Sequence, residues 1–390
     1  MIGTHRHLKY SLTTPNKIIL IRTILAFSIA AIDTIWSLYM DSFGMQDSTI
    51  GFINAALTAI TILAALTLTP LLETFHEKKI TKYSIYALIT SCLGFMLSES
   101  ILLFFLFALL YSISTSVRVT CLTILLRDNS TKKSFTKHNG LQGSLLSLGW
   151  FLGPVIAGSL LGTFGLSSVF LFSAGMGLLG LILFSRGDSI SEKIHSKIIH
   201  KNILKNSLLY LKQKKTYLPS LMQIGIDFWW ALIFIYVPLV MISQGLGPQY
   251  IGIFIGLTQL PLVLIENYAG KKAAITGFRT FFVLGFSLLG IAALSSFYIT
   301  EIEIVLLLLV LASIAMAFIE AQPTAYFFSK ISQKEEEILS PIFNLMPFVG
   351  SFLGKIVLAA FLIFFPQESI FMVTAIVMFI FAGTALVNRE

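Results

Sequence analysis

Long apolar segments separated by short polar breaks fill this chain from Lys17 to Val387, and they limit its fold more than any other feature. A helix needs about 20 apolar residues to cross a bilayer, and open strands cannot satisfy their backbone polar groups there. A composition that is 56% hydrophobic and only 12% charged excludes a water-soluble domain of 390 residues. We therefore predict an all-α integral membrane protein with twelve transmembrane helices. The predicted spans are residues 17–40, 49–72, 82–98, 101–126, 139–161, 167–185, 217–242, 250–269, 278–298, 303–329, 340–365 and 368–387.

Basic residues lie in every second break, which predicts the orientation of the chain. The basic breaks are residues 78–82, 127–137, 186–215, 271–279 and 330–334. The charged residues of the other breaks are all acids: Asp41, Asp47, Glu99, Glu301, Glu303 and Glu368. Short loops rich in Lys and Arg stay cytoplasmic during insertion. The pattern predicts a multi-pass protein of the plasma membrane with both termini in the cytoplasm. Its net charge of +8 would then face anionic lipid headgroups rather than a nucleic acid.

The longest break divides the spans six and six. We expect an N-terminal half over residues 1–185, a linker over 186–216 and a C-terminal half over 217–390. Apolar linker residues such as Ile194 and Ile198 recur at loose helical spacing among Lys and His, which predicts an amphipathic helix on the cytoplasmic membrane surface.

Short sequence matches indicate that the two halves are repeats. A shift of 201 residues lays Gly44 and Ile50 on Gly245 and Ile251. The same shift lays the segment 149–153 of the fifth span on the segment 350–354 of the eleventh. Internal repeats of this weak kind are characteristic of secondary transporters.

The fifth span contains Gly149, Gly153, Pro154 and Gly158 in the run Gly-Trp-Phe-Leu-Gly-Pro-Val-Ile-Ala-Gly. Small residues let two helices approach closely, and a proline bends the helix near that contact. The run resembles motif C, GxxxGPxxxG, of the major facilitator superfamily, and twelve spans split by a basic loop are also similar to that family. The alternative is an ordinary helix-packing face. The resemblance implies two pseudo-symmetric six-helix bundles with a small-molecule site between them.

The loop after the second span is similar to the family's motif A, approximately GxxxDRxGRR, only in part. Its segment begins at Glu73 and retains an acid followed by a base at Glu77 and Lys78, but both glycines are replaced. Motif A is therefore degenerate here.

Four charged residues stand out inside predicted spans: Asp33 in the first, Arg118 in the fourth, Asp227 in the seventh and Glu320 in the tenth. Burial of such groups in a membrane is costly unless they face a cavity or a partner, so each is a functional candidate. In the family that this chain resembles, these four helices line the central cavity. Arg118 beside a carboxylate predicts either substrate and proton binding or a structural ion pair.

Aromatic residues accompany two of these acids, because Trp36 and Trp230 each follow an Asp by three residues on the same helix face. Together with Tyr39 they predict a cavity wall for an amphipathic or cationic ligand, or alternatively an aromatic belt at the membrane interface. Further cavity candidates, which in the case of the amides also serve to join helices, are Asn54, Gln142, Gln259, Asn344 and Lys355.

These features predict a secondary active transporter of a small molecule. Every His lies in a cytoplasmic segment, so a carboxylate must carry any coupled proton, and no group of acids and hydroxyls predicts a sodium site. Motif C favours export, hence an antiporter, and we expect a monomer. With no P-loop, HExxH or Cys/His cluster, and with Cys92 and Cys121 inside spans, we expect neither an enzyme nor a cofactor or metal site. The alternative is a non-transporting scaffold, sensor or lipid-handling protein with the same fold.

The predicted topology can be tested by labelling single cysteines in intact cells with a membrane-impermeant thiol reagent. We expect a cysteine in the break 41–48, 243–249 or 299–302 to react, because these breaks face outward. A cysteine at Lys133 or Lys272 should stay unlabelled until the membrane is permeabilised. Labelling of either position in intact cells contradicts the topology.

Overall fold

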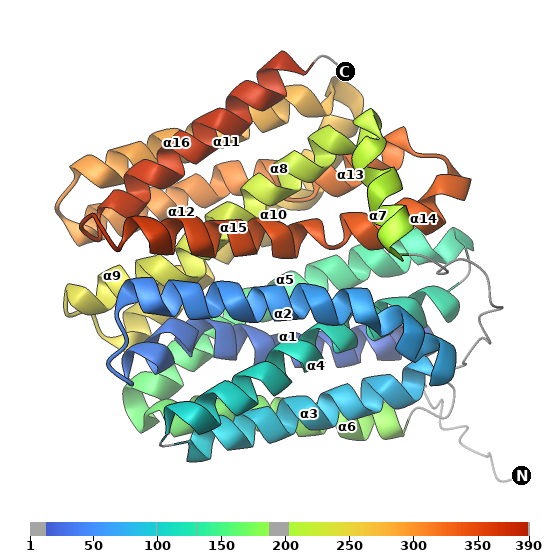
Figure 1. The fold of residues 1–390 in the computed structure, drawn as a ribbon, viewed down its shortest axis with the longest axis horizontal. Helices are drawn as coiled ribbons and strands as arrows, with labels where there is room; N and C mark the ends of the chain where they lie inside the picture. The colour runs from blue at the N-terminus through green and yellow to red at the C-terminus, as the bar shows by residue number, and fades with distance from the viewer. Residues whose placement is uncertain (1–12, 99, 131, 187–202, 389–390) are drawn as a thin grey trace, which may run out of the picture.

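The computed structural model describes residues 13–98, 100–130, 132–186 and 203–388, and across these ranges the chain is built from helices without strands (Figure 1). Twelve helices in the described ranges are long and apolar enough to cross a membrane. Their bounds agree with the predicted spans to within a few residues. The largest difference is the third span, which starts at Glu77 rather than at residue 82.

The N-terminal half consists of six helices without internal breaks and fills the lower part of Figure 1. They are α1 (Thr14–Asp41), α2 (Asp47–Thr74), α3 (Glu77–Leu97), α4 (Ile101–Asp128), α5 (Lys132–Phe164) and α6 (Leu166–Ser185). Within this half α1 packs on α5 and α6, and α3 packs on α4 and α6.

The C-terminal half repeats the arrangement, but three of its membrane-crossing segments are interrupted. Its elements are α8 (Lys214–Ala231), η1 (Leu232–Tyr236), α9 (Val237–Ser243), α10 (Pro248–Thr276), α11 (Phe278–Tyr298), α12 (Ile302–Ile319), α13 (Gln322–Lys330), α14 (Gln333–Phe343), α15 (Met346–Phe361) and α16 (Ser369–Val387). The first transmembrane segment of this half is thus α8, η1 and α9 in continuation.

Each interruption comes just before a proline. The π-helical turn η1 precedes Pro238, the break at Glu320–Ala321 precedes Pro323, and the break at Asn344–Leu345 precedes Pro347. Proline lacks an N–H donor and clashes with the preceding turn, so the helix ahead of it is disrupted. π-helical turns and discontinuous helices are frequent at functional sites in membrane transporters.

The repeat predicted from the sequence is present in the packing. Gly44 and Gly245 both adopt left-handed backbone conformations, with φ of 73° and 76°, in the turn after the first span of each half. A Cβ atom on Gly153 would lie 2.8 Å from Cβ of Ala30, and one on Gly354 would lie 2.7 Å from Cβ of Ala231. The shift of 201 residues takes Gly153 to Gly354 and Ala30 to Ala231. Close approach of the fifth helix to the first therefore recurs in the second half.

Tight contacts between the halves lie toward one face of the membrane. We call this face, which carries the loops 42–46, 244–247 and 362–368, the acidic side, and the opposite face the basic side. α5 packs on α10 and α2 packs on α15 across the two halves. A Cβ atom on Gly158 would lie 2.8 Å from Cα of Gly252, and Gln367 Nε2 donates a 2.7 Å hydrogen bond to Asp47 Oδ2. The halves are thus closely joined at the acidic side.

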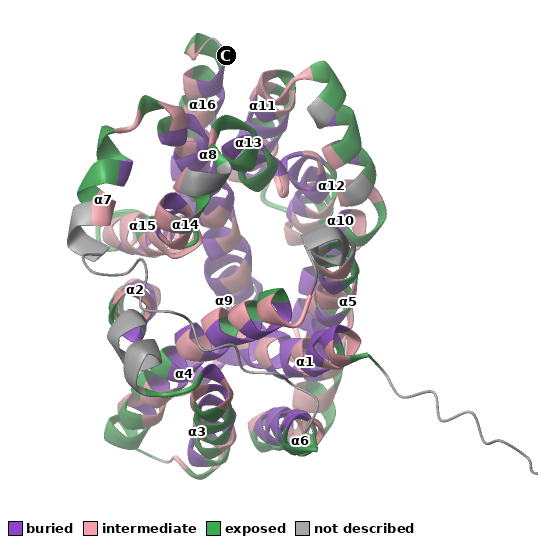
Figure 2. Ribbon diagram, turned by 90° about the vertical axis from the view of Figure 1, so that its right-hand side faces the viewer, coloured by how far each residue is buried: buried purple, intermediate pink, exposed green. Residues whose placement is uncertain are grey.

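The described end of the linker is tied to the C-terminal half on the basic side (Figure 2). Residues 187–202 lie outside the described ranges, and α7 (Ile203–Lys212) is the helical part of the linker that is seen. Tyr210 of α7 is buried in a small core with Phe327, Leu339, Ile342 and Phe343, whereas Leu208 and Leu211 are exposed. The exposed leucines fit the predicted membrane-surface helix, but the buried tyrosine packs on protein.

An ion pair holds the same region together, since Lys215 Nζ lies 2.5 Å from Glu335 Oε1. Hydrogen bonds from Lys215 and from the backbone and hydroxyl of Ser332 lower the pKa of Glu335 to about 2. Because this pKa is depressed, the stabilisation is present above the ordinary Glu value of about 4.3 and is lost as the pH falls toward 2. The contact therefore stays charged throughout the physiological pH range.

The Gly158–Gly252 contact predicts that a larger side chain at Gly158 opens the acidic side. A Leu there would push α5 away from α10, and such overpacking typically costs about 1–3 kcal/mol. We expect Gly158→Leu to raise the rate at which an impermeant thiol reagent labels a cysteine at Ser351 from the acidic side. The matched variant is Gly153→Leu, which packs on α1 within one half and should lower thermal stability without raising labelling. Equal labelling in Gly158→Leu and the parent would show that this contact does not hold the halves together.

Candidate functional site

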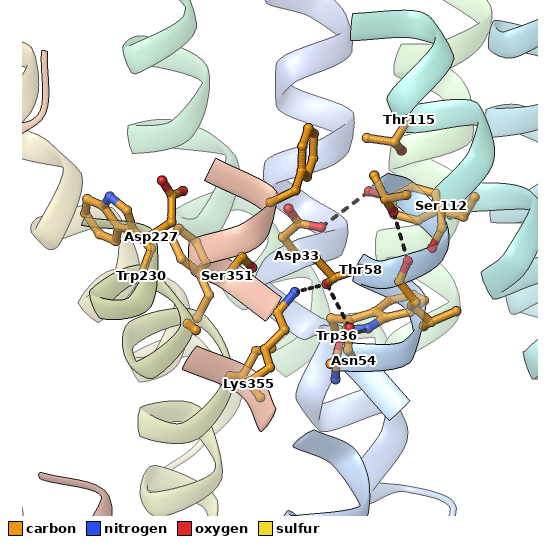
Figure 3. A pocket seen from close by; sticks show the side chains of 17 residues that line it. Asp33, Trp36, Asn54, Thr58, Ser112, Thr115, Asp227, Trp230, Ser351 and Lys355 are labelled. Atoms are coloured by element: carbon orange, nitrogen blue, oxygen red, sulfur yellow. Dashed lines mark hydrogen bonds between the residues drawn. The ribbon is translucent and has the colours of Figure 1, made fainter. Parts of the chain in front are cut away.

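A cavity of about 260 Å³ lies between the two halves. Its walls come from α1, α2 and α4 on one side and from α8, η1 and α15 on the other. The lining residues are Asp33, Trp36, Asn54, Leu57, Thr58, Thr61, Tyr111, Ser112, Thr115, Asp227, Trp230, Ala231, Phe234, Ile235, Phe348, Ser351 and Lys355 (Figure 3). Three of these residues are charged, so the halves meet around ionisable groups.

Each half contributes one carboxylate to the cavity. Asp33 Oδ1 accepts a 3.3 Å hydrogen bond from the hydroxyl of Tyr111, and Asp227 Oδ2 accepts a 2.8 Å hydrogen bond from Gln223 Nε2. Among the described residues no lysine or arginine nitrogen lies within 4.0 Å of either carboxylate. The second oxygen of each acid is neither hydrogen-bonded within that part of the chain nor enclosed by protein atoms. Both acids therefore present an acceptor to the cavity.

Lys355 bridges the halves through a hydrogen bond. Its Nζ donates at 2.8 Å to Oγ1 of Thr58 on α2, and it interacts electrostatically with both Asp33 and Asp227 (Figure 3). The Thr58 hydroxyl donates in turn to the backbone oxygen of Asn54 at 2.8 Å. The ammonium group is thus fixed between a carboxylate of each half.

Aromatic rings form much of the remaining wall. The ring of Trp36 stacks on that of Tyr111 at a centroid distance of 5.7 Å, and its Nε1 donates to Asn54 Oδ1 at 2.8 Å. On the other side Trp230 contacts Phe234 at a ring distance of 5.7 Å. Both tryptophans are therefore oriented by protein contacts and expose ring surface to the cavity.

Arg118 and Glu320, predicted to share the cavity with the two aspartates, lie behind its walls instead. Arg118 is 1% exposed, donates from Nη2 to Thr115 Oγ1 at 3.2 Å, and has no partner for Nη1 among the described residues. Glu320 stands at the break after α12 and accepts a 3.0 Å hydrogen bond from Trp230 Nε1. Each charge is thus linked to the cavity through a lining residue, and Arg118 forms no ion pair with a described carboxylate.

Tyr39 and Gln259 are not in the cavity wall, contrary to prediction. Tyr39 lies farther along α1, where its hydroxyl donates to the backbone oxygen of Phe95 and its ring is packed against Phe104 and Phe170. Gln259 is buried in α10, where its amide contacts the neighbouring hydroxyl of Thr258. The contacts seen for these two residues are therefore within one half, away from the cavity wall.

The other sequence candidates have separate positions. Gln142 accepts a 2.9 Å hydrogen bond from Arg22, and Asn344 lies at the break before α15. In motif A, Glu77 is buried in the first turn of α3, where a carboxylate suits the helix N-terminus, and Lys78 is half-buried beside it. The side chain of Glu73 is outside the described part.

Several functional candidates were missed by the sequence reasoning. Thr58, Tyr111 and Thr115, which carry hydroxyl groups, line the cavity. The α4 residues could have been predicted, because 111, 112 and 115 lie on one face of the helix. Arg22 was also missed: it precedes Asp33 by eleven residues, three helical turns, and donates to Thr123 Oγ1 at 3.0 Å.

Comparison with known proteins now identifies the family. A sequence model described as Major Facilitator Superfamily matches residues 18–354. This chain belongs to the major facilitator superfamily. A search of curated proteins finds no matching sequence.

Solved structures of the same fold agree. A POT family transporter in complex with 5-aminolevulinic acid has a TM-score of 0.80 at 11% identity, over 96% of this chain and 95% of that one. A POT family transporter in complex with a thioalcohol-conjugated peptide has a TM-score of 0.81 at 12% identity, over 96% and 95%. The human organic anion transporter MFSD10 (TETRAN) has a TM-score of 0.70 at 14% identity, over 95% and 99%. Family and fold together make this superfamily member a multi-pass membrane transporter, in a family whose members are generally not enzymes.

The bond between Lys355 and Thr58 predicts a specific loss of stability. We expect Thr58→Val to lower the free energy of unfolding by about 1.5–3 kcal/mol, since the hydroxyl accepts from a charged donor. Thr61→Val is the matched control: Thr61 also lines the cavity and also donates to its own helix, at Leu57 O, but accepts nothing from Lys355. Thermal unfolding in detergent measures both. Equal shifts in the two variants would show that the bond across the halves contributes nothing.

Proposed function

We propose that this chain is a proton-coupled secondary transporter that moves a small organic solute by alternating access between its two halves. The observation that supports it best is that each half brings one carboxylate, Asp33 or Asp227, to a single cavity with Lys355 fixed between them. A solute held there contacts both halves, so its binding can bias their relative position. Two of the structural neighbours are complexes with organic solutes, 5-aminolevulinic acid in one and a thioalcohol-conjugated peptide in the other.

The coupling to protons follows from charge balance. The cavity is lined by two acids and one base, so one negative charge is left over when all three are ionised. An unbalanced charge in a low-dielectric site is costly. One proton on Asp33 or Asp227 neutralises the cavity, and so does one cationic group of a solute. A proton and a solute can therefore replace each other, which is the requirement for antiport.

Direction and location complete the proposal. Because the halves are closely joined at the acidic side, we infer that solute reaches the cavity from the basic side. We place the protein in the plasma membrane, with both termini and the basic loops in the cytoplasm. In this orientation the cavity receives solute from the cytoplasm. Uptake at the cytoplasmic face and release outside, against inward proton movement, makes the protein an exporter that works as a monomer.

Neutralising the acids tests the coupling. In proteoliposomes with an internal pH-sensitive dye, a solute panel is screened for solute-induced proton movement under an imposed pH gradient. For the solute found, we expect Asp33→Asn or Asp227→Asn to reduce this flux by roughly 30-fold, as for loss of an interaction of about 2 kcal/mol. Glu320→Gln, behind the wall, should reduce it less.

The control for these variants is Glu303→Gln, which removes an exposed acid at the start of α12 and should leave the flux unchanged. Solute exchange without a gradient is measured in parallel, because it reports transport that does not need the proton. If all three cavity and near-cavity acids can be neutralised with unchanged solute-induced proton flux, proton coupling through them is wrong.

A further inference from the structure

The charged residues that line the cavity do not balance. Asp33 and Asp227 are acids and Lys355 is a base, so one negative charge remains when all three are ionised. Behind the wall, Arg118 and Glu320 are one base and one acid, which cancel each other and leave this difference unchanged.

The uncompensated charge is accessible from inside the cavity. The unpaired oxygens of Asp33 and Asp227 face it, as described above, whereas the nearby bases are engaged elsewhere: Lys355 on Thr58, and Arg118 on Thr115 behind the wall. Glu320 accepts a hydrogen bond from Trp230 and does not line the cavity. A positively charged group entering the cavity would find two acceptors that no described cation occupies.

The walls favour a cation that carries a flat or apolar body. Trp36 and Tyr111 line it on one side and Trp230 and Phe234 on the other, and aromatic rings attract cations and apolar groups alike. The volume of about 260 Å³ is below the ~300–1,000 Å³ typical of pockets for drug-sized ligands. The occupant is therefore small.

We propose that the cavity selects a small organic monocation, an amine with an aromatic or apolar body, and that Lys355 sets the selected charge at one. Asp33 and Asp227 bind the ammonium group from opposite halves, and the aromatic side chains hold the body. This deepens the transport function proposed above and rests on it for the movement of the bound amine. A neutral solute leaves the excess negative charge in place and an anionic solute adds to it. A dication leaves the cavity with one excess positive charge.

Four probes of nearly the same shape separate these cases: 2-phenylethylamine as monocation, 2-phenylethanol as neutral, phenylalanine as zwitterion and 3-phenylpropanoate as anion. Binding to the purified full-length protein is measured at pH 7 by calorimetry and by fluorescence, because Trp36 and Trp230 line the cavity. We expect 2-phenylethylamine to bind at least about tenfold more tightly than the other three. Glu303→Gln should bind all four as the parent does.

Charge substitutions give a second, sharper result. Asp227→Asn should lose the preference for the monocation. Lys355→Met leaves two acids without a base and should shift the preference to the dication m-xylylenediamine. The double variant Asp227→Asn with Lys355→Met again leaves one negative charge in the wall and should recover the preference for 2-phenylethylamine. If Lys355 were only a structural bridge, its loss would weaken all probes alike.

The proposal is overturned if the neutral, zwitterionic or anionic probe binds as tightly as the monocation, if no probe binds, or if the double variant fails to recover the monocation preference while remaining folded. These assays contain no gradient and no membrane transport. A protein that binds the amine but moves no protons in proteoliposomes would contradict the proposed transport function and leave the ligand class supported. Proton-coupled transport of a non-cationic solute would support the proposed transport function and contradict the ligand class.

Discussion

The cost of burying charge in a bilayer is the constraint on which the arrangement of this molecule depends. The helices α3, α6, α11 and α16 carry no charged residue in their middle turns, whereas the buried charges sit on the helices that meet near the interface of the halves or pack behind it. Lipid can accommodate the first group, and only a polar interior can accommodate the second. The cavity is thus the consequence of placing ionisable groups where the two bundles face each other.

The two halves are alike in packing and unlike in continuity. α1 and α5 cross closely through Gly153 and Ala30, and the corresponding helices of the second half do so through Gly354 and Ala231. Yet the three interrupted segments belong to the C-terminal half in the described part of the chain. Trp230 connects the two features, because it lines the cavity and donates to Glu320 at one of the breaks. A ligand that displaced this ring would break a hydrogen bond to the interruption in the tenth span.

How far the sequence alone predicts this structure depends on the kind of feature. The spans could be predicted because about 20 consecutive apolar residues have few alternatives, and Asp33, Asp227 and Lys355 were found because a charge in such a run is conspicuous. The side-chain directions of Arg118 and Tyr39 could not be predicted, since helix periodicity gives a face but not the tilt that decides which turn of that face meets the cavity. The breaks were equally hidden: Pro323 and Pro347 follow interruptions, but Pro154 lies within the unbroken α5.

The repeat relates the helices of the two halves but not the charges of the cavity. Under the shift of 201 residues, Asp33 corresponds to Phe234, Asp227 to Ala26, and Lys355 to Pro154 of motif C. Gly149 and Gly153 correspond to Gly350 and Gly354, whereas no cavity charge has a charged counterpart. Two-fold symmetric packing therefore encloses an asymmetric set of charges and rings. A bound solute would meet Asp33, Tyr111 and Trp36 on one side and Asp227, Trp230 and Phe234 on the other, with Lys355 between. Because these walls differ, such a site can hold a small ligand in a single orientation. The two similar halves around it could then change their relative position without reorienting the ligand.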